Sequence, residues 1–222
     1  MSNSKLATYT NISPKSSSRN GNKVERIIVH HMAFVSTAKA CCDSHKNSSR
    51  QVSANYYIGK NGDIAQGVDE SRRAWTSGSF DADGKAVTIE VSNSVNGNPK
   101  GGDGWLVSDK AFNALVELCA DICKRNGIKE LTFTKNKAKD TLSGHKQWDS
   151  TVCPGDYLYG KFPELCEKVN AKLTAKEEPK QTSDKIYYVQ IGAFSDKKNA
   201  EAYVDKAKKA GFNAVIKEET RK

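Results

Sequence analysis

The sequence lacks any long apolar run. Hydrophobic residues make up 37% of its 222 residues, yet no stretch approaches the roughly 18 apolar residues of a membrane-spanning helix. The first residues, MSNSKLATYTNIS, also lack the apolar segment of a secretion signal. We therefore expect no membrane insertion, and a chain that stays in the cytoplasm where it is made until something releases it.

Cysteine and histidine are both scarce. Six cysteines are too few for a secreted disulfide scaffold, and no CxxC or HxxxH pair marks a structural zinc site. Cys119 and Cys123 are four residues apart in an apolar stretch, which predicts one buried helix face. The sequence thus favours a reduced, globular protein.

Positive charge is in excess, with a net charge of +9 and a pI of about 9.2. Such a surface attracts polyanions, and both nucleic acid and an anionic cell wall are candidates. No arginine-rich arm or RNA-binding aromatic pattern is present, so we expect no nucleic-acid partner.

Strand and helix patterns alternate along the first 173 residues. Residues 1–23 are rich in Ser, Asn and Lys and predict an extended leader. The turn Lys60-Asn61-Gly62-Asp63 predicts a hairpin of type I′. Predicted strands cover residues 26–30, 54–59, 64–68 and 86–91, and predicted helices cover 37–46, 108–126 and 162–173. This order indicates an α/β domain with a mixed central sheet flanked by helices.

A charged stretch without apolar periodicity separates this domain, residues 1–173, from a short tail. Residues 174–185 predict a linker, and residues 186–222 follow it. The tail predicts a strand at 186–191, a helix at 197–210 and a strand at 213–217, a single βαβ unit that is too short to bury a core alone.

The four histidines suggest one site of chemistry. His30 and His31 end the first strand, and His145 precedes Cys153 in GHKQWDSTVCPGD. Imidazole and thiolate bind zinc well, and three protein ligands leave one coordination position open for water or substrate. Spacing alone also allows a surface histidine and a buried free thiol. Neighbours on a strand point to opposite faces, so His30 and His31 cannot easily both face one metal. Spacing does not choose between them.

Five segments, in order, resemble the amidase-2 family, which includes phage lysozyme-like amidases and animal peptidoglycan-recognition proteins. They are IIVHH (27–31), VSANYYIGKNGDI (52–64), RAWTSGS (73–79), VTIEVSNS (87–94) and GHKQWDSTVCPGDYLY (144–159). The resemblance implies zinc bound by His30, His145 and Cys153. His31 takes the second-histidine position, usually not a ligand. His45 has no family role and is expected to be a solvated helix residue.

The same resemblance implies further roles. Glu90 takes the place of a proposed general base, and Thr151 that of a residue that contacts the oxyanion. Trp75 and Thr76 match a loop that lines the peptide groove. Some family members have a catalytic tyrosine where this chain has Ala54, so either that tyrosine is dispensable or Glu90 takes its role.

The tail, from YYVQIGAF onwards, resembles the first half of a SPOR domain, which binds glycan strands. Either two chains complete one another as a homodimer, or the tail is a remnant, or the sequence is cut short. The leading hypothesis is a phage endolysin that cuts the bond between N-acetylmuramic acid and L-alanine of peptidoglycan. It would remain in the host bacterial cytoplasm until lysis and then act on the cell wall. A binding module without catalysis and a basic nucleic-acid-binding protein are the alternatives.

Overall fold

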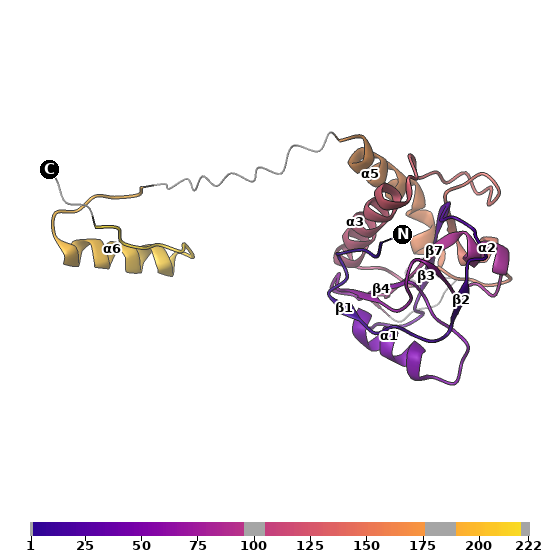
Figure 1. Cartoon of the computed structure of the whole chain (residues 1–222). Helices are drawn as coiled ribbons and strands as arrows, with labels where there is room; N and C mark the ends of the chain where they lie inside the picture. The colour runs from indigo at the N-terminus through magenta and orange to yellow at the C-terminus, as the bar shows by residue number, and fades with distance from the viewer. Residues whose placement is uncertain (1, 96–104, 176–189, 219–222) are drawn as a thin grey trace. The chain divides into compact units, whose positions relative to one another are not determined.

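The structure, a computed structural model, describes residues 2–95, 105–175 and 190–218. The chain divides into two compact units, Met1–Lys176 and Glu177–Lys222. Across the described residues, no helix combines the length and apolar character needed to cross a bilayer. The first unit contains the mixed sheet and its covering helices (Figure 1).

The first unit is built on a six-stranded sheet of order β1-β5-β4-β7-β3-β8. The pairs β3–β7, β3–β8, β4–β7 and β1–β5 are parallel, whereas β4–β5 is antiparallel. A separate antiparallel pair joins β2 to β6. The strands are β1 (Tyr9–Thr10), β2 (Ser16–Ser18), β3 (Arg26–His31), β4 (Tyr56–Ile58), β5 (Ile64–Gln66), β6 (Arg72–Ala74), β7 (Ala86–Val91) and β8 (Leu142–Gly144).

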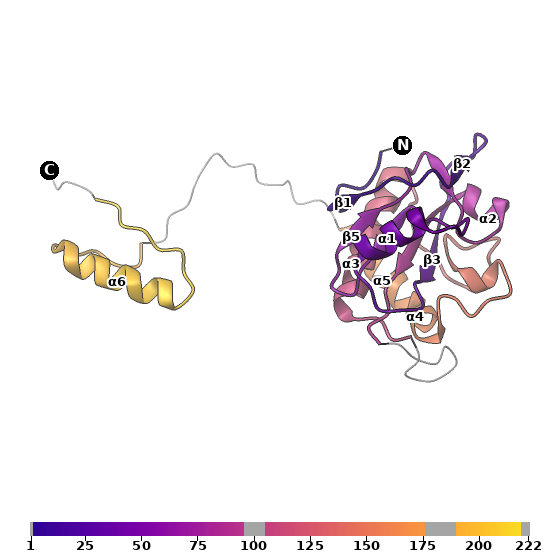
Figure 2. The same ribbon diagram turned by 90° about the horizontal axis from the view of Figure 1, so that it is seen from below.

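Helices cover both faces of this sheet. One face packs on α3 and α5 through the largest apolar cluster, which includes Ile27, Val29 and Ile89 of the sheet. The other face meets α1 and α2, and Figure 2 shows α1 in front of the sheet. The helices are α1 (Ala38–Asn47), α2 (Phe80–Gly84), α3 (Asp109–Asn126), the 3-10 turn η1 (His145–Gln147), α4 (Asp156–Gly160) and α5 (Phe162–Thr174).

Local sequence signals explain the helix ends. Ser108 accepts a hydrogen bond from the Ala111 N–H at the start of α3, and Gly127 ends the helix in a left-handed conformation, with φ of 73°. Thr37 caps α1 in the same way. The predicted helices and the mixed α/β class are therefore confirmed. Cys119 and Cys123 are fully buried in α3, as their spacing predicts.

The β4–β5 hairpin is confirmed, but its predicted turn type is wrong. A type I′ turn needs positive φ at both central residues. Here Gly62 has a φ of 85°, whereas the φ of Asn61 is not positive. The Gly59 N–H donates to the Asp63 carbonyl, so the loop is longer than a two-residue turn.

The predicted extended leader, residues 1–23, packs into the domain over its described residues. β1 extends the main sheet, β2 pairs with β6, and Arg19 is buried. The Arg19 guanidinium donates to the carbonyls of Glu70, Asp83, Gly84 and Ala86. This segment therefore belongs to the folded domain.

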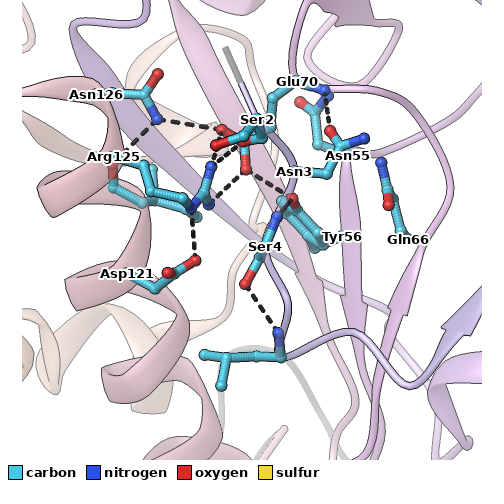
Figure 3. A network of polar contacts seen from close by, with 12 residues as sticks. Ser2, Asn3, Ser4, Asn55, Tyr56, Gln66, Glu70, Asp121, Arg125 and Asn126 are labelled. Atoms are coloured by element: carbon cyan, nitrogen blue, oxygen red, sulfur yellow. Dashed lines mark hydrogen bonds and ion pairs between the residues drawn. The ribbon is translucent and has the colours of Figure 1, made fainter. Parts of the chain in front are cut away.

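A buried ion pair also ties the first residues to the domain (Figure 3). The Glu70 carboxylate is fully buried and accepts hydrogen bonds from Arg125 at 2.6 and 2.9 Å and from the Tyr56 hydroxyl at 2.6 Å. The Ser4 N–H donates to the same Tyr56 oxygen, and Arg125 also donates to the Ser2 carbonyl. The network thus joins β4, α3 and the N-terminal segment.

In the second unit, α6 (Lys197–Lys209) confirms the predicted tail helix, with Asp196 as its N-cap. The strand predicted at 213–217 does not form, because no partner strand is present among residues 190–218 to complete its hydrogen bonds. The strand predicted at 186–191 lies mostly outside the described residues, and the two that are described, Gln190 and Ile191, are not in a strand.

Candidate metal centre and active site

Three side chains meet where β3 and β8 end. His30 is the fifth residue of β3, His145 follows β8 directly, and Cys153 lies in the loop after η1. One ligand atom from each lies within 4.8 Å of the others. The rings of His30 and His145 have centroids 4.6 Å apart. The structure therefore brings together the three residues predicted as metal ligands.

The Cys153 loop is held by backbone hydrogen bonds. The Cys153 N–H donates to the Thr151 hydroxyl at 3.2 Å, and the Cys153 carbonyl accepts from the Lys146 N–H at 2.8 Å. The His31 N–H approaches the Cys153 thiol at 3.4 Å. Consequently the sulfur lies beside the end of β3. The peptide bond between Cys153 and Pro154 is cis.

The donor set fits a zinc ion. Both imidazoles have a buried Nε2 atom without a hydrogen-bond partner in the part of the chain that the structure describes. Burial lowers the pKa of His30 well below its usual value, which keeps the ring neutral, as a metal ligand must be. Burial and the nearby Glu90 raise the pKa of the Cys153 thiol, and a bound cation would offset this cost.

His31 lies on the opposite face of β3 from His30. Its ring packs edge-on against Trp105, with centroids 5.1 Å apart, and burial lowers its pKa to about 4. The alternation of the strand thus decides between the two histidines, which spacing could not do.

Glu90 of β7 pairs with His30 of β3, and Tyr57 of β4 pairs with Glu90 on its other side. Paired residues of parallel strands share a face, so these three side chains form one row. Glu90 is 7% exposed, and its Oε2 has no hydrogen-bond partner among the described residues. Burial raises the pKa of its carboxyl to about 8. Glu90 is therefore a buried carboxylate in the row of His30, and not an outward, solvated strand residue.

Thr151 lies next to the candidate ligands. Its hydroxyl oxygen accepts the Cys153 N–H, and its own hydrogen remains available to donate. This arrangement makes Thr151 part of the turn that presents the thiol.

Trp75 and Thr76 follow β6. Trp75 is half-buried, and its indole N–H donates to Ser17 at 3.2 Å. The Thr76 hydroxyl is buried, donates to the Ser53 carbonyl at 2.7 Å and contacts the Thr88 hydroxyl at 2.8 Å. Thr76 therefore fixes its loop, whereas Trp75 keeps part of its ring accessible.

His45 is not the solvated residue that its place in a polar helix suggested. It is half-buried in α1, and its Nδ1 lies 3.1 Å from the Tyr57 hydroxyl. The same hydroxyl accepts the Ala54 N–H at 2.9 Å. The Tyr57 hydroxyl thus lies beside the backbone of Ala54. Some members of the family that the sequence resembles have a tyrosine at the position of Ala54. The sequence did not indicate this pair, because the packing of α1 against β4 is not encoded in any local pattern.

Comparison with protein families identifies the class. The N-acetylmuramoyl-L-alanine amidase family, amidase-2, matches residues 20–156, which is more than half of the chain. The chain therefore belongs to this family of peptidoglycan amidases. The SPOR domain family matches residues 183–222. None of the curated proteins that were compared with the chain matches it.

Solved structures share the fold. The Staphylococcus aureus hydrolase AmiA, in complex with its ligand, has a TM-score of 0.59 at 17% identity, covering 78% of this chain and 85% of its own. The PlyG catalytic domain gives 0.54 at 19% identity, covering 77% and 98%. The endolysin amidase LysCS from Clostridium intestinale gives 0.51 at 20% identity, covering 78% and 100%. At these identities the likeness concerns the fold alone.

Proposed function

We propose that the chain is a zinc-dependent phage endolysin that hydrolyses the amide bond between N-acetylmuramic acid and L-alanine and so lyses the cell wall. Its membership of the amidase family supports the reaction. The observation that carries the metal is the group of His30, His145 and Cys153, whose ligand atoms lie within 4.8 Å of one another.

Amide hydrolysis needs a deprotonated water, a polarised carbonyl and a proton for the leaving nitrogen. Zinc, when bound by the three residues, supplies a Lewis acid and lowers the pKa of water. Glu90 takes the proton of the attacking water and passes it to the leaving nitrogen. Its pKa of about 8 suits a group that must accept and then donate a proton near neutral pH.

Thr151 and Trp75 complete the proposed site. The free hydrogen of the Thr151 hydroxyl is available to the oxyanion, because its oxygen already accepts the Cys153 N–H. The accessible part of the Trp75 ring can stack on a sugar or on the stem peptide. Thr76 contributes to substrate binding indirectly, since its buried hydroxyl fixes the loop that carries Trp75.

We assign the tail to wall binding, because residues 183–222 match the SPOR domain. Several large apolar side chains of this short unit are exposed, and a second copy of the tail is the partner that we propose for them: Ile191, Phe194, Tyr203, Phe212, Val215 and Ile216. In this proposal the protein stays in the host cytoplasm until lysis and then reaches the wall, where its basic charge favours an anionic surface.

The test is a digest of purified Gram-positive peptidoglycan, with and without a zinc chelator. We expect new N-terminal alanine without new reducing sugar ends, lost on chelation and restored by zinc. Reducing ends alone would contradict amidase activity. No new ends of either kind would favour a binding module that lacks catalysis.

A further inference from the structure

Arg73 is a cationic side chain that the proposed reaction does not use. It is the central residue of β6 and pairs with Ser17 of β2. Opposing residues of an antiparallel pair share a face, so Arg73 and Ser17 lie on the same face of this two-stranded ribbon. Trp75 also lies on that face, because its indole N–H donates to the Ser17 hydroxyl at 3.2 Å. Arg73 is therefore a neighbour of the tryptophan that we assign to substrate binding.

The Arg73 guanidinium is held by an aromatic ring and not by an acid. Its central carbon lies over the Phe80 ring, 4.7 Å from the ring centroid, at the start of α2. Its Nε is buried and has no hydrogen-bond partner in the described part of the chain. None of the ion pairs between described residues includes Arg73. A guanidinium over a ring keeps the N–H donors at its edge available to a further partner.

The buried carboxylate of α2, Asp83, is engaged elsewhere. Its two oxygens accept the N–H groups of Ser77, at 3.0 and 3.2 Å, and of Thr76, at 3.1 Å. The positive charge of Arg73 favours the ionised form of Asp83 and so lowers its pKa, but no direct ion pair joins the two side chains among the described contacts. Asp83 thus leaves the edge of the Arg73 guanidinium open.

Arg72 shows how a neighbouring arginine differs when its donors are used. It lies on the opposite face of β6 and is exposed. Its guanidinium donates to the Ser16 hydroxyl at 2.8 Å and to the Ser16 carbonyl at 3.1 Å. Arg72 therefore supports the ribbon, whereas Arg73 has no comparable contact.

The ribbon continues into a turn that lies close to the proposed general base. The Thr76 hydroxyl contacts the Thr88 hydroxyl at 2.8 Å. Thr88 precedes Glu90 by two residues in β7, so their side chains share a face and are about 7 Å apart along the strand. An extended peptide spans about 3.3–3.6 Å per residue. Two or three peptide residues therefore suffice to extend from Glu90 past Thr88 toward the ribbon.

The chemistry of a muramyl peptide decides which group could meet Arg73. Its lactyl carboxyl is part of the amide bond that is cut, and its sugar is uncharged, so its acidic groups lie on the peptide. On the basis of the proposed amidase function, we infer that Arg73 binds the free α-carboxylate of the stem-peptide residue that follows L-alanine. The planar guanidinium matches a carboxylate through two parallel hydrogen bonds, and Phe80 holds it in place. The enzyme then prefers stem peptides in which this carboxyl is not amidated.

The experiment compares two soluble muramyl tripeptides that differ only in the α-carboxyl of the second peptide residue, which is free in one and amidated in the other. We expect the full wild-type chain to cleave the free acid with a kcat/KM about 10- to 100-fold higher, the usual effect of hydrogen bonds to a charged group. Arg73→Gln should lose this preference by slowing only the cleavage of the free acid. Arg72→Gln, the matched control on the opposite face of β6, should keep it.

The outcomes separate this role from a structural one and from the proposed function. Equal cleavage of both peptides by the wild type, or a preference that R73Q retains, would overturn the role of Arg73. Equal slowing of both peptides by R73Q would also overturn it, because Arg73 would then only support the fold. If R73Q does not fold, Arg73→Lys must still reduce the preference, because an ammonium cannot form the bidentate pair. A wild-type chain that cleaves neither peptide would contradict the proposed amidase function itself.

Discussion

At the scale of single residues, the two neighbouring histidines of β3 provide a matched pair. We expect His30→Ala to abolish zinc retention and amidase activity, because His30 faces His145 and Cys153. His31→Ala should retain zinc, because the contact of His31 with the thiol is made by its backbone N–H. Metal content after dialysis checks this. Equal loss of zinc in both variants would contradict the assignment.

Glu90 allows a second substitution. Glu90→Gln keeps the shape of the side chain but cannot carry the transferred proton. We expect kcat to fall by about 10²- to 10⁴-fold while zinc content stays at the wild-type level. Steady-state kinetics on a soluble muramyl peptide, with metal analysis of the same samples, would check this. A variant with unchanged kcat would remove Glu90 from the mechanism.

The partly buried imidazole of His45 should make the free energy of unfolding depend on pH. Burial lowers its pKa from 6.5 to about 4, so the unfolded chain binds the proton more tightly than the folded one. The stabilising contribution is complete above pH 6.5 and is lost as the pH falls toward 4. We expect the free energy of unfolding to decrease less between pH 7 and pH 5 in His45→Asn than in the wild type. Urea unfolding of both at the two pH values would measure this, and equal decreases would refute it.

At the scale of elements, the Glu70–Arg125 pair joins the turn before β6 to α3, and Arg125 also bonds the N-terminal segment. Removing one partner of a buried pair costs about 3–5 kcal/mol, and the lower end applies here because Arg125 keeps its pair with Asp121 at 2.8 Å. Glu70→Gln should therefore lower the free energy of unfolding by about 3 kcal/mol. The control is Glu117→Gln, which breaks the exposed pair with Lys172 and should cost less than about 1 kcal/mol. Similar effects of the two substitutions would contradict a structural role of the buried pair.

The elements that sequence analysis predicted are those with local signals. The α3 helix was placed by its cap Ser108 and its stop Gly127, which act within one turn. The N-terminal strands β1 and β2 were missed because their partner strands, β5 and β6, are far away in sequence. Arginine is usually exposed to solvent. The burial of Arg19 is explained by the four carbonyls that accept hydrogen bonds from its guanidinium.

The candidate site was predicted in a similar, partial way. Motif resemblance indicated His30, Glu90, His145 and Cys153, because each lies in a segment that matches the family. The row of His30, Glu90 and Tyr57 depends on strand register, which no single segment encodes. The prediction of a solvated His45 was wrong because its contact with Tyr57 depends on how α1 packs on β4.

At the scale of the whole molecule, the two compact units predict separable functions. A chain ending at Lys176 retains the sheet, its helices and the candidate metal site. We expect it to cleave a soluble muramyl peptide like the full chain but to sediment less with purified cell walls. Activity assays and cosedimentation would check this. Equal sedimentation of both chains would contradict a wall-binding role for the tail.

The distance in sequence between the candidate ligands affects the order of events during synthesis. His30 leaves the ribosome long before Cys153, and β8 comes after α3. A nascent chain therefore cannot close the metal site until its catalytic domain is nearly complete. Residues 177–222 are made after that point, so the finished domain can fold and bring the three candidate ligands together while the remaining residues still tether it to the ribosome.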